Sequence, residues 1–161
     1  MSLWVVDASP LIFLSKLDRL DLLRRSADQV IAPPAVLREI SEYRDKASAK
    51  IEDARRTWLG VREAEDRRIV DVLMADLDVG ESEAIALAIE AGAERVVLDD
   101  LDARRLADRL GLSRIGTLGL LLAAKLRGEL PSLRAEIDRL RKAGFRVSPA
   151  LAQALLQQAA E

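Results

Sequence analysis

Short apolar runs alternate along the chain with longer segments in which apolar residues recur every three or four positions. The runs have the length of buried strands, and the longer segments have the spacing of amphipathic helices. The predicted strands cover residues 3–6, 30–32, 58–61, 95–98 and 114–116. This repeated order of strand and helix predicts a parallel sheet connected by right-handed crossovers, with helices on both of its faces.

Capping residues mark where several of the helices are expected to begin. Ser9 precedes Pro10 in the order of an N-cap and a first helical residue, and Thr117 stands in the capping position of a later helix. The predicted helices cover residues 10–23, 34–40, 69–77, 81–91, 102–110 and 117–128, and two more follow, interrupted near residue 131 and at residues 144–149. Gly80 is expected to break the chain before residue 81. The highly charged stretch 42–56, which contains Arg44, predicts a solvated helix or a hairpin.

The length and the apolar content set the scale of the fold. A chain of 161 residues, half of them apolar, is long enough to bury a core as one domain. Aromatic residues make up only 3% of it, so the core is expected to consist of Leu, Ile, Val and Ala. We predict one α/β domain over residues 1–161, a three-layer α/β/α sandwich with a central, mainly parallel sheet. The leucine-rich helices at about residues 132–161 are expected to pack on this domain or on a second copy of the chain.

Cysteine and histidine are both absent from the sequence. Their absence excludes disulfides, thiolate nucleophiles, Ser-His-Asp triads and almost every catalytic zinc site. Any chemistry then depends on carboxylates, hydroxyls, Lys, Arg and backbone groups. The net charge of −2 argues against a protein that coats phosphates through a generally basic surface, but it is compatible with a nuclease that gathers acids around metal ions.

The N-terminal sequence lacks the features of an export signal. No basic segment precedes the first apolar run, and that run ends at Asp7. No window of the sequence is apolar over the length of a membrane span. Together with the missing cysteines, these features predict a cytoplasmic protein that does not bind membranes.

Two of the predicted strands end directly in acidic residues. Asp7 follows the first strand, and Asp99 and Asp100 follow the fourth. Sites of open α/β sheets form beyond the carboxyl ends of the strands, so these carboxylates converge if the two strands are neighbours. Glu39 and Glu81 are placed to join them from flanking helices. Crowded carboxylates are costly without a cation, and an all-oxygen site suits Mg²⁺ or Mn²⁺.

Each of these residues also has a purely structural interpretation. Asp7 is a common type of helix cap, and one of Asp99 and Asp100 is able to bind metal while the other caps the helix that follows. Glu81 and Glu83 open a helix, where the macrodipole favours acids. Glu39 can be a solvated side chain without a catalytic role, and Ser9 and Thr117 can be simple N-caps.

The ordered set of motifs is more specific than any one of them. The motifs are VVDASPLI at residues 5–12, VLREI at 36–40, GESEAIALA at 80–88, VVLDD at 96–100 and IGTLGLL at 115–121. In this order they resemble the PIN-domain family over essentially the whole chain, from Leu3 to about Leu155. The resemblance is closest to an uncharacterised prokaryotic subgroup related to VapC toxin ribonucleases.

This resemblance implies a metal-dependent ribonuclease of the VapC toxin type, which hydrolyses RNA phosphodiesters with Mg²⁺ or Mn²⁺. The implied catalytic metal ligands are Asp7, Glu39, Glu81 and Asp99 or Asp100, with Glu83 as the alternative to Glu81. Contacts to these ligands or to RNA are implied for Ser9, Glu83, Arg104 and Thr117. Two residues depart from the family pattern: Glu81 stands where many relatives carry Asp, and Leu98 replaces the threonine that often precedes the last acid.

The resemblance also implies partners, and it leaves alternative functions open. The expected partners are an RNA substrate, a second copy of the chain in a homodimer and an antitoxin protein. The main alternative is a catalytically silent PIN-like module that binds RNA or protein. A phosphatase or phosphotransferase with an aspartyl nucleophile is disfavoured because Ala8 and Ser9, and no second Asp, follow Asp7. The order of the acids also differs from that of a response-regulator receiver.

Overall fold

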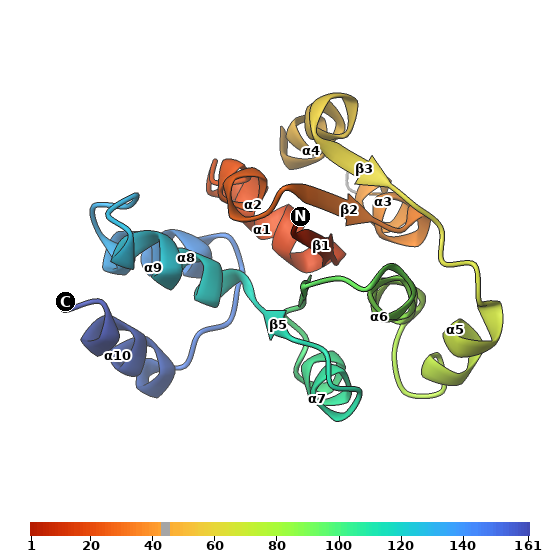
Figure 1. Ribbon diagram of the computed structural model, residues 1–161. Helices are drawn as coiled ribbons and strands as arrows, with labels where there is room; N and C mark the ends of the chain where they lie inside the picture. The colour runs from red at the N-terminus through yellow and green to blue at the C-terminus, as the bar shows by residue number, and fades with distance from the viewer. Residues whose placement is uncertain (43–45) are drawn as a thin grey trace.

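The computed structural model describes residues 1–42 and 46–161. Its centre is a sheet of five strands, all parallel, in the order β3-β2-β1-β4-β5 (Figure 1). The strands are β1 (Leu3–Val6), β2 (Gln29–Ala32), β3 (Leu59–Val61), β4 (Arg95–Val97) and β5 (Arg114–Ile115). The predicted strands are therefore confirmed, each to within one residue at either end.

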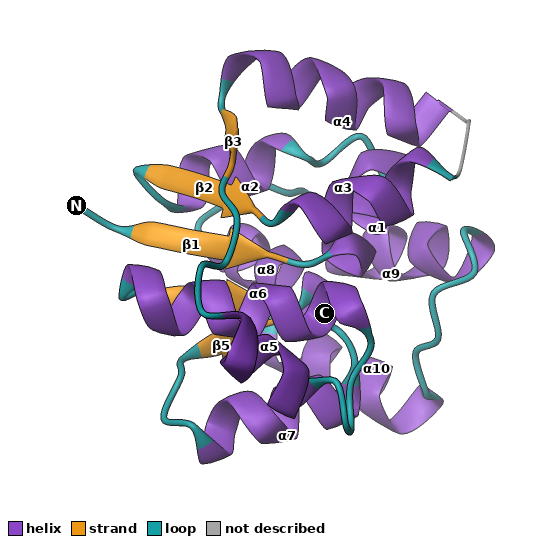
Figure 2. Cartoon of the chain, turned by 90° about the vertical axis from the view of Figure 1, so that its right-hand side faces the viewer, coloured by secondary structure: helices purple, strands orange, loops and turns teal. Residues whose placement is uncertain are grey.

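Helices cover both faces of this sheet, which confirms the predicted three-layer α/β/α fold (Figures 1 and 2). Side chains alternate along β1: Val5 belongs to one buried cluster, whereas Trp4 and Val6 belong to the other. The cluster around Val5 is closed by α5 (Arg67–Leu73), α6 (Val79–Ala91) and α7 (Leu101–Arg109). The larger cluster is closed by α1 (Ala8–Lys16), α2 (Asp21–Ser26), α3 (Pro34–Ser41), α4 (Lys46–Thr57), α8 (Thr117–Leu126), α9 (Leu133–Lys142) and α10 (Pro149–Gln158).

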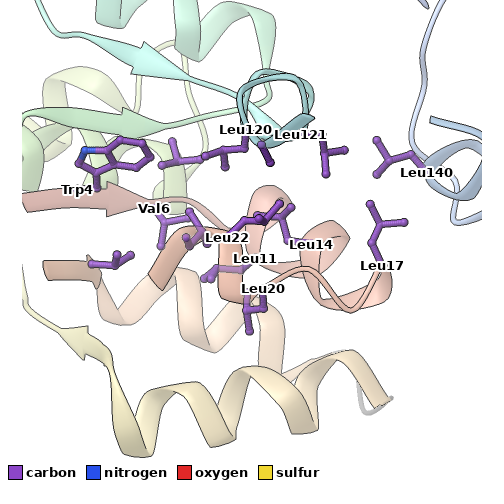
Figure 3. Close-up of a cluster of buried hydrophobic side chains, with 14 of the residues drawn as sticks. Trp4, Val6, Leu11, Leu14, Leu17, Leu20, Leu22, Leu120, Leu121 and Leu140 are labelled. Atoms are coloured by element: carbon purple, nitrogen blue, oxygen red, sulfur yellow. The ribbon is translucent and has the colours of Figure 1, made fainter. Parts of the chain in front are cut away.

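The larger cluster joins the two ends of the chain. Figure 3 shows Leu11 and Leu14 of α1 lying below Leu120 and Leu121 of α8, next to β1. Leu140 of α9 is fully buried in the same cluster, and α10 contributes further side chains to it. The C-terminal helices thus pack on the same core as the first strand. None of the helices in the described part of the chain is long and apolar enough to cross a membrane.

Several predicted helix boundaries are wrong. The segment 10–23 forms two helices, α1 and α2, because Asp18 takes a left-handed backbone (φ 58°) between them. Ser9 is not an N-cap, since α1 begins at Ala8 and Asp7 holds the capping position. Gly80 does not break the chain but lies in the first turn of α6.

Two further predictions concern the helices α4 and α8. The structure describes residues 46–57 of the charged stretch as α4, whose Ala47, Ile51 and Ala54 are buried at helical spacing. Residues 43–45, including Arg44, lie outside the described residues. In α8, Thr117 is the first helical residue and not the cap, because Gly116 occupies the N-cap position.

Candidate active site at the strand ends

The candidate site lies where β1 and β4 run side by side. Val6 is paired with Val97, and the N–H of Asp7 donates a hydrogen bond to the carbonyl of Val97 at 3.1 Å. The chain passes from β1 to β2 on one side of the sheet, whereas β4 lies on the other side, so the strand order reverses here. Ligand sites of open parallel sheets form at such reversals, beyond the carboxyl ends of the strands. The fold therefore places the acidic strand ends where a site is expected.

Asp7 is a buried carboxylate without full hydrogen bonding. Its side chain is 5% exposed, and its Oδ1 is buried with no hydrogen-bond partner within the described residues. Although Asp7 holds the N-cap position of α1, its side chain makes no capping bond there. Burial, together with the charges of Asp78, Glu39 and Asp99, raises the pKa of Asp7 to about 7, against the opposing effect of a backbone hydrogen bond with Ala8. A buried acid with one oxygen that lacks a partner is a group that a cation would stabilise.

Gly80 lies next to three carboxylates. A Cβ placed on Gly80 would lie 3.1 Å from Oε2 of Glu39, 3.6 Å from Oδ1 of Asp7 and 3.6 Å from Oδ1 of Asp78. Any other residue here would insert a side chain between these oxygens. Glu39 reaches this point from α3, and burial together with Asp78 and Glu42 raises its pKa. Asp7 and Glu39, two of the ligands that the resemblance implies, thus both lie next to Gly80, as does Asp78.

Asp78 was not among the predicted site residues. It is the N-cap of α6, and its Oδ1 accepts from the N–H of Glu81 at 2.8 Å, while Oε1 of Glu81 accepts from the N–H of Asp78 at 3.3 Å. This reciprocal pair is a capping box, and its sequence signal is an Asp followed three residues later by Glu. Burial, the bond with Asp78 and the charges of Asp78, Asp100 and Asp7 raise the pKa of Glu81 to about 8.

Asp99 and Asp100 have separate roles. Oδ2 of Asp99 accepts from the hydroxyls of Ser9 and Thr117, both at 2.7 Å, and Oδ1 accepts from the N–H of Thr117 at 2.7 Å. Gly116 permits this approach, because a Cβ there would stand 3.0 Å from Oδ1 of Asp99. Asp100 caps α7 through the N–H of Ala103 at 3.0 Å. Asp99 therefore faces α1 and α8, whereas Asp100 lies toward Glu81, whose pKa its charge raises.

Glu83 and Arg104 lie at the edges of this group. Glu83 is buried and binds Arg67 at 2.9 Å and the N–H of Ala35 at 3.2 Å, so it ties α6 to α5 and α3. Arg104 is partly exposed, and its Nε is buried without a hydrogen-bond partner in the part of the chain that is described. Burial and the neighbouring Arg114 lower the pKa of Arg104.

The acids share one region, but they do not stand around a common point as metal ligands. Across residues 1–42 and 46–161, no three acidic side chains form a group with the geometry to hold a metal ion. Oxygens of Asp78, Glu81, Asp99 and Asp100 instead accept hydrogen bonds from the protein. The donor set is chemically suited to a hard divalent cation, because it consists of carboxylate oxygens and includes the unpaired Oδ1 of Asp7. A shared cation would require some of these side chains to rotate.

Comparison with known proteins identifies the family. A family model described as a PIN domain (DUF3368) matches residues 3–161. The chain therefore belongs to the PIN-domain family, a class of α/β domains that are generally nucleases. No curated protein matches the chain.

Proposed function

We propose that this PIN domain is a ribonuclease that depends on Mg²⁺ or Mn²⁺ and acts as a VapC-like toxin. The observation that carries the proposal is the buried Oδ1 of Asp7, which has no partner among the described residues and borders Gly80 together with Glu39 and Asp78. A carboxylate kept in this state destabilises the fold, so its presence favours a function that uses it. The resemblance of the sequence to VapC relatives supports RNA as the substrate and an antitoxin as a partner.

In this proposal Asp7, Glu39 and Glu81 hold the metal ion, and Asp99 or Asp100 completes the set. A bound divalent cation supplies an activated water and neutralises the charge that develops on the phosphodiester. Ser9 and Thr117 position Asp99 through their hydroxyls. Asp100 is less available as a metal ligand because its Oδ2 already accepts the capping hydrogen bond of α7. In the capping box, the N–H of Asp78 competes with the metal ion for Oε1 of Glu81. The carboxylate of Asp78 is itself a further candidate ligand.

A catalytically silent PIN-like module that binds RNA or protein is the second candidate. It is favoured by one observation, namely that no three acids in residues 1–42 and 46–161 form a metal-holding group. A homodimer and a cytoplasmic location belong to the proposal on the strength of the family resemblance and the sequence composition alone.

Cleavage of RNA by purified protein separates the two candidates. Wild type, Asp7→Asn and Glu39→Gln are incubated with single-stranded and structured RNAs in Mn²⁺ or in a chelator, with the exposed Asp76→Asn as a matched carboxylate control. The nuclease proposal expects cleavage by wild type and Asp76→Asn only in Mn²⁺, with a loss of at least about 100-fold in the two site variants. Equal background cleavage by all four proteins would reject the nuclease and favour the silent module.

A further inference from the structure

A hollow of about 320 Å³ lies beside the acidic residues of the candidate active site. Asp99 lines it, so the hollow and the proposed site share this residue. Its other walls combine two kinds of side chain, which come from α7, β5, α8 and the C-terminal segment. The basic residues are Arg104, Arg114 and Arg146, and the main apolar ones are Leu118, Phe145 and Leu151.

The arginines of this hollow lack a full set of acceptors. Arg114 is paired with Asp108 through two hydrogen bonds of 3.1 Å. The charge of Arg104 is repelled by Arg114 and attracted by Asp99 and Asp108, yet its buried Nε has no hydrogen-bond partner among the described residues. Arg146 is exposed, and no ion pair or hydrogen bond of its side chain is found in the described part of the chain. A guanidinium whose buried Nε has no acceptor, and which lies beside a second positive charge, would be stabilised by an anion.

The apolar wall narrows the choice of anion. The ring of Phe145 packs edge-on against Phe13, with centroids 4.9 Å apart and an interplanar angle of 85°, so its orientation is fixed. Leu151 lies in the same wall although it is 45% exposed. An inorganic phosphate would gain nothing from these side chains, whereas a nucleotide presents a phosphate to arginine and a base to an aromatic or aliphatic surface.

We infer that this hollow binds one nucleotide of a single-stranded RNA, next to the phosphodiester that lies at the acidic group. Arg104 and Arg146 bind the phosphate, and Phe145 and Leu118 contact the base. The inference rests on the proposed function for its choice of RNA, but it concerns binding and does not require cleavage.

Affinity for RNA in the absence of metal tests the inference. A short fluorescent single-stranded RNA is titrated by anisotropy into Asp7→Asn protein, alone and combined with Arg104→Gln, Arg146→Gln or Phe145→Leu. Arg105→Gln is the matched control, because Arg105 lies on the same helix as Arg104 and is exposed. We expect Arg104→Gln to weaken binding by about 10-fold or more and to lower the slope of log Kd against log salt by about 0.7. Phe145→Leu is expected to weaken binding by about 5-fold or more, and Arg105→Gln by less than about 2-fold.

Thermal denaturation of the same variants separates binding from folding. Arg104→Gln removes a charge whose buried Nε has no acceptor, so its Tm is expected to stay equal or rise. A fall in Tm of several degrees with unchanged affinity would overturn the inference in favour of a structural role for Arg104.

The inference and the proposed function fail in different ways. Metal-dependent cleavage by wild type, together with equal affinity of the Arg104→Gln and Arg105→Gln proteins, would overturn the nucleotide hollow and leave the nuclease intact. Absence of cleavage, together with binding that depends on Arg104 and Phe145, would support the hollow and reject the nuclease. Absence of RNA binding by all of the proteins would overturn the hollow.

Discussion

Thr117 holds Asp99 with both of its donors. Its hydroxyl donates to Oδ2 of Asp99 and its N–H donates to Oδ1, each at 2.7 Å. Thr117 is fully buried, and Ser9 supplies a third bond to the same carboxylate. Bonds to an ionised acceptor are the stronger kind, so this arrangement fixes the direction of Asp99 at the carboxyl end of β4.

Replacing Thr117 by Val tests whether this positioning matters. Val keeps the shape of the side chain but removes the hydroxyl, at a cost of about 1.5–3 kcal/mol for the lost charge-assisted bond. We expect the Tm to fall by about 3–10 °C and RNA cleavage to fall by about 10-fold or more. Thr117→Ser restores the hydroxyl and is expected to recover both. Recovery of stability without recovery of cleavage would contradict the positioning role.

Replacing Gly80 by Ala is expected to lower activity without lowering stability. The Cβ of Gly80→Ala would stand 3.1 Å from Oε2 of Glu39 and 3.6 Å from Oδ1 of Asp7. Ala is a better helix former than Gly, so the Tm is expected to stay equal or rise. The methyl group displaces the carboxylates, and cleavage is expected to fall by about 10- to 100-fold. The control is Ala86→Gly, in the same helix as Gly80, which is expected to lower stability alone. Gly92→Ala is unsuitable as a control because Gly92 has a positive φ.

Strand ends were the part of the site that the sequence predicted well. A buried apolar run followed by an acid identifies both the end of a strand and the direction of the site, which applies to Asp7 and Asp99. The sheet order that makes β1 and β4 neighbours follows from long-range pairing, but either order of the strands would have kept these acids on the same edge.

Helix starts were predicted less well, with consequences for the site. Interpreting Gly80 as a break concealed that α6 begins at Val79 and that Asp78 is its cap. The directions of Glu81 and Glu83 depend on that start, since a shift of one residue turns a helix by about 100°. Local sequence also does not show that Asp18 takes a left-handed backbone between α1 and α2, whose leucines belong to one buried cluster.

Glu81 and Glu83 are expected to respond differently to mutation. Glu83→Gln weakens the bond to Arg67 and replaces the carboxylate that accepts from the N–H of Ala35 by a weaker acceptor. We therefore expect a loss of about 1–3 kcal/mol, or about 2–10 °C in Tm, with cleavage within about 3-fold of wild type. Glu81→Gln removes a carboxylate whose pKa is raised to about 8, so its Tm is expected to stay equal or rise while cleavage is lost. Both effects are measured by thermal denaturation and RNA cleavage. The reverse assignment, with activity lost only in Glu83→Gln, would make Glu83 the ligand.

The raised pKa of Asp7 makes the stability of the metal-free protein depend on pH. The folded pKa of about 7 lies above the ordinary 3.8, so the folded state holds the proton more tightly. This contribution to stability is fully present below about pH 4 and is lost as the pH rises through 7. Asp7→Asn removes the titration, and its Tm is expected to exceed that of wild type by an amount that grows from pH 4 to pH 7 and then levels off, reaching about 8–16 °C. Saturating Mn²⁺ stabilises wild type alone and is expected to close this gap, because a bound cation favours the ionised carboxylate. Melting curves over this pH range, with and without Mn²⁺, measure both effects, and a gap that is independent of pH would show that Asp7 does not titrate in the folded protein.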